Sequence, residues 1–85
     1  MILYHGTNWE NAQEILKVGL IPKTAPESEQ PSIWLTTDRE YASNFGDAIL
    51  EIELPDSEMQ YMWPSMPTVY RCFESIRPDL IRLSP

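Results

Sequence analysis

The chain has 85 residues, with thirteen acidic residues against six basic ones, one cysteine and one histidine. This length predicts a single domain that buries about 60–65% of its unfolded surface. The lone Cys72 excludes an internal disulfide, and a single histidine excludes a zinc site of Cys/His spacing, so we expect no metal. The net charge of −7 and the scattered Lys and Arg residues argue against a nucleic-acid partner and favour a neutral or basic one.

The apolar residues are numerous but never continuous. Their share of 42% is too high for a disordered chain. No run approaches the roughly 18 apolar residues of a membrane span, and the first residues lack the basic start and apolar stretch of a signal peptide. We therefore expect a folded cytoplasmic protein with no membrane partner.

The first third of the chain predicts a strand followed by a helix. Residues 2–5 form a short apolar run that stops at Gly6, which predicts a buried strand. Thr7 and Glu10 have capping-box spacing and predict the start of a helix, and Gly19 predicts its end in a left-handed conformation. One face of this helix is apolar and consists of Trp9, Ala12, Ile15 and Leu16.

The same order of strand, threonine, helix and glycine follows a long polar loop. Residues 21–32 hold three prolines and several polar residues, which predicts a surface loop. Residues 33–36 predict a second strand. Thr37 and Glu40 repeat the capping-box spacing, and Gly46 predicts the end of a second short helix.

The second half of the chain predicts two more strands around an apolar loop. Residues 48–54 alternate apolar and polar side chains, so Glu51 and Glu53 should lie on a face in water. Residues 56–67 carry methionines and aromatics without a clear period, which predicts a loop folded over the core or over a ligand.

The last residues predict a strand over 68–73 and a short helix with Pro78 in its first turn. Two short helices and four or five short strands predict one α+β domain over residues 1–85, built on a small, mostly antiparallel sheet.

The triplet His5-Gly6-Thr7 lies where the first strand meets the first helix. A residue without a Cβ atom lets a ligand approach the backbone, and the free N–H groups of a helix start can bind an anion or an amide. The alternative is that His5 is a hydrogen-bonded residue at a strand end and Thr7 is only a helix cap.

Aromatic residues cluster on the next strand and helix. Trp34 lies on the strand, and Tyr41 and Phe45 are four residues apart on the helix, where they share one face. Such residues can hold a planar ring between Trp34 and one of the helix aromatics. The alternative is that Tyr41 and Phe45 pack in the core.

At this point the chain resembles the ADP-ribosyltransferase superfamily, in the branch that includes poly(ADP-ribose) polymerases, diphtheria-type toxins, rifampicin ADP-ribosyltransferases and tRNA 2′-phosphotransferases. Seven short segments carry the resemblance, in order along nearly the whole chain: residues 4–7 (YHGT), 18–22 (VGLIP), 33–37 (IWLTT), 41–46 (YASNFG), 49–54 (ILEIEL), 69–70 and 76–81. The resemblance implies an ADP-ribosyltransferase-like α+β fold with a split sheet.

The resemblance also implies a site for NAD. His5 would bond the ribose beside nicotinamide, the Gly6 backbone would bind the carboxamide, and Thr7 completes the motif. Trp34, where a tyrosine is usual, and Phe45 would stack on the nicotinamide ring, with Tyr41 on the same helix. Both replacements keep an aromatic face, although Trp34 offers only its indole N–H as a donor.

The third motif of the family departs from the pattern. Family members place a catalytic glutamate near the start of the late strand, and this chain has Pro67 and Thr68 there. Glu58 in the preceding loop, or Glu74 beyond the strand, would have to replace it. We expect Glu58 to be the catalytic acid with His5, and Arg71 or Arg77 to contact the pyrophosphate.

Two functions follow from these expectations. The first is a small mono-ADP-ribosyltransferase that uses NAD, releases nicotinamide and modifies a protein or a small molecule. The second is a catalytically inactive protein of the same fold that acts by binding another protein. The ordered set of motifs favours the first, which we take as the prediction. The missing glutamate, the short chain and the negative charge are the grounds for the second as the alternative.

Overall fold

The sheet of this small α+β protein has six strands in the order β4-β5-β2-β1-β3-β6, and every described pair is antiparallel. The computed structural model describes residues 1–23 and 31–85. The elements in chain order are β1 (Ile2–Thr7), α1 (Trp9–Val18), β2 (Ile33–Thr36), α2 (Arg39–Ala42), the 3₁₀ helix η1 (Ser43–Phe45), β3 (Ala48–Glu53), η2 (Asp56–Tyr61), β4 (Met62–Met66), β5 (Val69–Cys72), η3 (Pro78–Leu80) and β6 (Ile81–Leu83). Residues 24–30 of the predicted surface loop lie outside the described residues.

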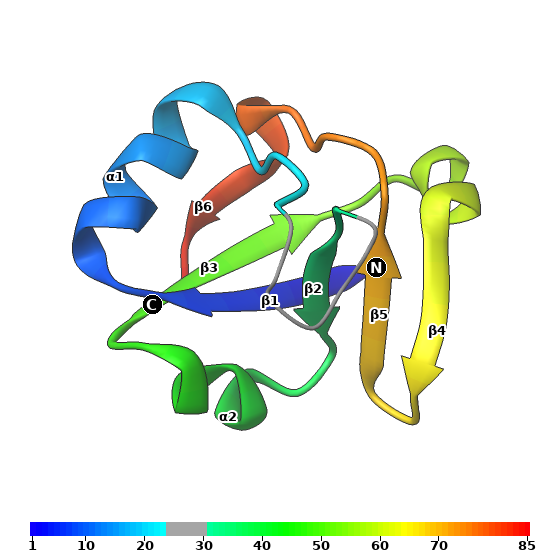
Figure 1. Ribbon diagram of the computed structural model, residues 1–85, viewed down its shortest axis with the longest axis horizontal. Coiled ribbons are helices and arrows are strands. Elements are labelled where there is room, and N and C mark those ends of the chain that lie inside the picture. Colours follow the sequence, from blue (N-terminus) through cyan, green and yellow to red (C-terminus); the bar gives the residue numbers. More distant parts are fainter. Residues whose placement is uncertain (24–30) are drawn as a thin grey trace.

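The two halves of the sheet are joined narrowly. β1 pairs with β3 over six positions, from Ile2↔Glu53 to Thr7↔Ala48. In contrast, the described pairing of β1 with β2 consists of Tyr4↔Thr36. The strands therefore separate beyond Tyr4, on the side where β1 leads into α1 (Figure 1).

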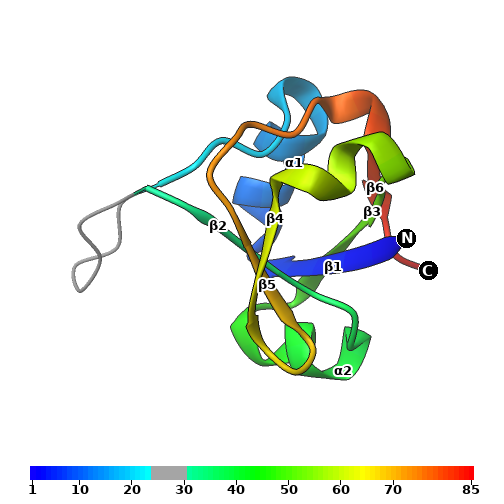
Figure 2. The ribbon, with the colours of Figure 1, turned by 90° about the vertical axis from the view of Figure 1, so that its right-hand side faces the viewer.

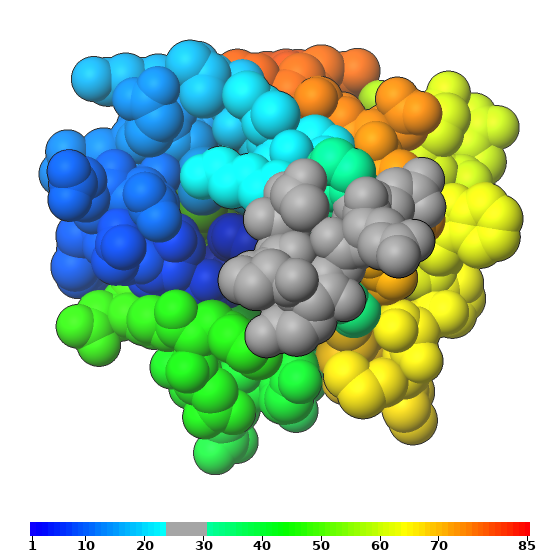
Figure 3. Space-filling model, in the orientation of Figure 1, coloured from blue at the N-terminus to red at the C-terminus, as the bar shows by residue number. Residues whose placement is uncertain are grey.

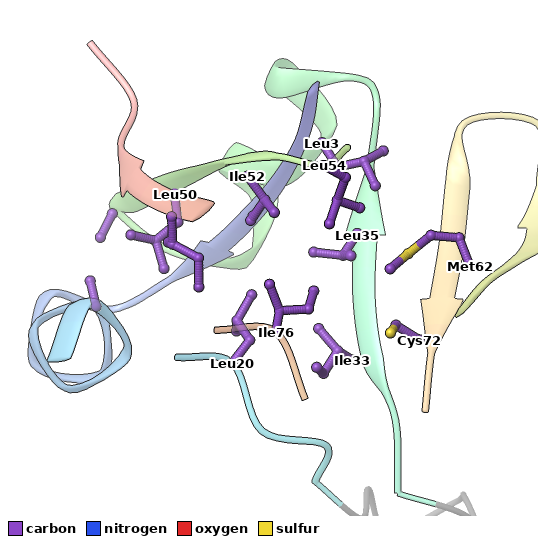
Figure 4. Packing of buried hydrophobic residues seen from close by; sticks show 13 residues of the cluster. Leu3, Leu20, Ile33, Leu35, Leu50, Ile52, Leu54, Met62, Cys72 and Ile76 are labelled. Carbon is purple, nitrogen blue, oxygen red and sulfur yellow. The ribbon is translucent and has the colours of Figure 1, made fainter. Parts of the chain in front are cut away.

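One face of the sheet carries the core. Leu3, Leu50 and Ile52 are fully buried there, since alternate residues of a strand share a face. Figure 4 shows these side chains pointing toward Leu20 and Ile76. Ala12 brings α1 onto the same cluster, so α1 and the segment around η3 cover this face.

The helix α1 begins one residue later than its threonine predicts. The side chain of Asn8 caps it by accepting a hydrogen bond from the N–H of Asn11 (2.7 Å), while Thr7 is the buried last residue of β1. Gly19 does end the helix, at φ 91° and ψ 179°, an extended conformation open to glycine rather than the expected left-handed helical one. Thr7 is therefore a strand residue and not a cap.

The helix α2 lies on the other face of the sheet, below β1 where α1 lies above it (Figures 1 and 2). Its cap is Asp38, one residue after the predicted Thr37, and the Asp38 carboxylate accepts from the N–H groups of Glu40 (3.0 Å) and Tyr41 (3.3 Å). The helix that this cap begins packs on β1, where the Ala42 backbone lies against Gly6. Among the described elements, no helix is long and apolar enough to span a membrane.

Two other sequence predictions were wrong, and one strand was not predicted. Glu51 is buried rather than in water, because Arg82 of the adjacent strand β6 bonds its carboxylate (Nε to Oε2, 2.6 Å), whereas Glu53 is exposed as predicted. The predicted loop over 56–67 instead holds the helix η2 and the edge strand β4, and β6 follows the expected helix at Pro78.

Candidate functional site

A cavity of about 410 Å³ opens between α2, η1 and the joint of β1 and β2. Its walls are largely apolar and aromatic. The lining residues are Tyr4, His5, Gly6, Trp34, Leu35, Thr36, Tyr41, Ala42, Phe45, Met66 and Val69. The structure therefore brings His5, Gly6, Trp34, Tyr41 and Phe45 of the predicted site to one cavity.

His5 occupies the gap where β1 and β2 separate. If the register from Tyr4↔Thr36 continued, Gly6 would pair with Trp34. Instead the His5 ring lies near the Trp34 backbone, with Nδ1 2.9 Å from the Trp34 carbonyl oxygen. A carbonyl only accepts, so Nδ1 carries the proton and Nε2 of the neutral ring is an acceptor.

The protonation state of His5 follows from its surroundings. Burial lowers the pKa of His5 below its ordinary value, and the charge of Lys23 acts in the same direction. The bond to the Trp34 carbonyl opposes this shift. The net direction favours the neutral ring, which leaves Nε2 able to accept a hydrogen bond from a hydroxyl group.

The aromatic walls are open to solvent rather than packed in the core. Phe45 is 60% exposed and Trp34 is 43% exposed. Tyr41 meets Phe45 edge to face, with ring centroids 5.4 Å apart and an angle of 70° between the planes. The prediction that these residues face a ligand-sized space fits this exposure better than core packing does.

Gly6 holds α2 close to β1. A Cβ atom at Gly6 would lie 1.8 Å from the carbonyl oxygen of Ala42, a contact that no side chain can make. The glycine thus sets the distance between β1 and the helix that carries Tyr41. Gly6 also lines the cavity.

A second cavity of about 310 Å³ lies on the α1 side of the sheet. His5 and Trp34 line it together with Thr7, Asn11 and Lys23, so these two residues separate the two spaces. Thr7 belongs to this second cavity and does not line the first.

The structure does not bring Glu58 to His5. Glu58 lies on η2, where its carboxylate bonds Arg77 at 3.1 Å, and it lines a different pocket of about 110 Å³ beside Cys72. Arg77 lines the same small pocket, where it also pairs with Asp79, and it does not line the aromatic cavity. Among the described residues, no acid lines that cavity. Glu74 likewise lines the small pocket.

Six lining residues were not among the predicted site residues, and they are Tyr4, Leu35, Thr36, Ala42, Met66 and Val69. Tyr4 and Thr36 had a usable signal, since each neighbours a predicted site residue and they pair across the two strands. Met66 and Val69 flank the Pro67-Thr68 turn between β4 and β5, and nothing in the sequence placed that turn beside Trp34.

Comparison of the chain with protein-family models, curated proteins and solved structures finds no match in any of the three. A functional assignment therefore has to come from the geometry of the described residues.

Proposed function

We propose that the chain binds NAD at this cleft and transfers its ADP-ribose to a protein or small-molecule acceptor, with release of nicotinamide. One observation carries the proposal: a histidine whose Nδ1 bonds the Trp34 carbonyl borders an open aromatic cavity that the backbone of Gly6 also lines. A cavity of about 410 Å³ falls in the usual range for small-molecule sites.

Each wall of the cavity has a task in this proposal. The nicotinamide ring stacks on Trp34, with Phe45 and Tyr41 across from it. Its carboxamide meets the backbone at Gly6, and Nε2 of His5 accepts a hydrogen bond from a hydroxyl of the adjoining ribose. The second cavity, on the other side of His5, offers space for the rest of the dinucleotide.

The chemical contribution of the chain is positional and electrostatic. Holding the ring and the ribose from different elements fixes the glycosidic bond for attack by the acceptor. Neutral His5 orients the ribose without placing a positive charge next to the carbon that becomes electron-poor. Glu58 has no part in this step, since it lies in another pocket.

The test combines calorimetry with a transfer assay. We expect NAD to bind the wild-type chain, and His5→Ala and Trp34→Ala to weaken binding at least tenfold. Trp63→Ala is the matched control, because Trp63 is an exposed indole outside the cavity lining. Isotope-labelled NAD should yield free nicotinamide and a labelled acceptor in a lysate. Absence of NAD binding would refute the proposal.

The lack of an acid in the described lining favours a second function, which is NAD binding without transfer. In that case the chain acts as an interaction protein for a basic or neutral partner, in keeping with its net charge of −7. NAD binding that depends on His5 and Trp34, with no release of nicotinamide, would decide for this second function.

A further inference from the structure

Arg71 is built into the strand next to Trp34. It is the cross-strand partner of Trp34 in the β2–β5 ladder, and its guanidinium carbon lies 4.8 Å from the centre of the indole ring. The same guanidinium lies 5.1 Å from the ring of Phe73 and donates to Oγ of Ser32 at 3.2 Å. These contacts hold one positive charge over the indole.

The charge lies on the β5 side of Trp34, whereas β1, which carries His5 and Gly6 of the cavity, lies on the other side of β2. Trp34 lines that cavity, whereas Arg71 is absent from its lining within residues 1–23 and 31–85. A ring stacked on the cavity side of Trp34 would therefore have the guanidinium on the far side of the indole. The distance from the charge to such a ring is about 9 Å, with typical stacking distances.

We propose that Arg71 favours the departure of nicotinamide by acting through Trp34. The inference rests on the proposed function, and it names a role that the aromatic lining alone does not give. Arg71 does not contact the substrate in this proposal. It is a positioning residue that acts through Trp34, by keeping a positive charge at a fixed distance from the nicotinamide ring.

The effect follows from how charge moves in the reaction. The ring of bound NAD is a pyridinium cation. When the bond between its nitrogen and the ribose carbon breaks, the electron pair stays on nitrogen and nicotinamide leaves neutral. The acceptor then forms a bond to that carbon and releases its proton. Positive charge thus moves from the ring to the ribose.

A fixed positive charge behind the ring opposes the starting cation and favours the neutral product. A carboxylate beside the ribose promotes the same movement of charge from the opposite end. The described lining of the cavity holds no acid, so Arg71 supplies from behind the leaving group part of what an acid would supply in front of it.

The experiment compares two probes that differ mainly in charge, nicotinamide and the cation 1-methylnicotinamide, in titrations followed by NMR. At about 9 Å and an effective dielectric constant of about 20–40, the Arg71 charge should disfavour the cation by about fivefold to twentyfold. Arg71→Met and Arg71→Gln should shift the ratio of the two dissociation constants toward the cation by that factor. Arg71→Lys should keep most of the wild-type ratio.

Arg77→Met is the matched control, since it removes an arginine that pairs with Glu58 and Asp79 and should leave the ratio unchanged. An unchanged ratio in folded Arg71→Met and Arg71→Gln would overturn this inference and leave the proposed function intact. If the wild-type chain binds neither probe, this inference fails, and calorimetry with NAD decides the proposed function separately.

Discussion

His5 is a neutral histidine held between two strands, and this state makes the stability of the fold depend on pH. Burial lowers its pKa in the folded chain, whereas the unfolded chain keeps a value near 6.5. As the pH falls below about 6.5, the unfolded chain takes up the proton first, so the free energy of unfolding decreases. The decrease ends once the folded histidine is protonated too.

The variant His5→Asn isolates this contribution, because asparagine can still donate to the Trp34 carbonyl but does not titrate. We expect the wild-type chain to lose more stability than the variant between pH 7.5 and pH 5, measured by urea denaturation at each pH. The acidic residues titrate in both proteins and cancel in the comparison. An equal loss in the two proteins would contradict a neutral His5 in the folded chain.

Gly6 tolerates no side chain, because the backbone of α2 occupies the position of its Cβ atom. Gly6→Ala would place a methyl group 1.8 Å from the Ala42 oxygen, so α2 must move away from β1. We expect a loss of about 1–3 kcal/mol in the free energy of unfolding. The control Asn44→Ala, an exposed change in η1, should stay within about 0.5 kcal/mol. Equal denaturation midpoints for both variants would refute the close contact.

The site residues differ in how far the sequence could predict them. His5 and Gly6 stand together in the chain, and the spacing of Tyr41 and Phe45 gives one helix face, so short-range patterns found them. Met66 lies more than thirty residues from Trp34, and its place in the cavity depends on the pairing of β4 with β5 and of β5 with β2. Local patterns carry no such information. Glu58 was expected beside His5, but it bonds Arg77, which is nineteen residues away in the chain, and local patterns could not predict that contact either.

The edge strand β6 is held to the sheet by an ion pair on the face opposite the core. Glu51 is 8% exposed and accepts from Arg82, its cross-strand partner. Arg82→Ala leaves a buried carboxylate without its cation, and we expect it to cost about 1–3 kcal/mol of unfolding free energy. The double variant with Glu51→Leu should recover part of that loss, because no charge then remains buried.

The exposed pair of Arg77 and Glu58 is the internal control for this prediction. Its side chains are 55% and 28% exposed, so Arg77→Ala should cost less than about 1 kcal/mol. Urea denaturation of the single and double variants gives all the values. A larger loss of unfolding free energy for Arg77→Ala than for Arg82→Ala would contradict the view that the Arg82 pair is the more stabilising of the two.

Elements were predictable where one local signal was strong. The strand β2 occupies the predicted residues, and the alternation in β3 placed Leu50 and Ile52 in the core. The predicted helix starts were wrong by one residue. Asn8 and Asp38 are at least as good capping residues as the threonines that precede them, and they cap the helices instead. β4 and β6 escaped prediction, since β4 contains Pro64 and β6 has three residues.

The whole molecule is asymmetric about its sheet. The core face is closed by α1, Leu20 and Ile76, whereas on the opposite face α2 packs on β1 and β2, and no described α-helix packs on β4. The β4 segment forms one outer edge of the molecule (Figure 3). The aromatic cavity lies at the border between the covered and the open part of that second face.

This asymmetry predicts that the loss of unfolding free energy on truncating a side chain depends on which face of the sheet carries the side chain, and less on the size of the side chain. Leu50→Ala removes a fully buried side chain from the core face and should cost about 2–5 kcal/mol. Trp63→Ala removes a larger side chain that is 61% exposed and touches Phe73 edge to face, so it should cost no more than about 1.5 kcal/mol. A domain of 85 residues has a total of about 4–13 kcal/mol, so the first change leaves a marginal fold and the second a stable one. Urea denaturation decides between them, and a larger loss for Trp63→Ala would mean that the open face is covered in solution.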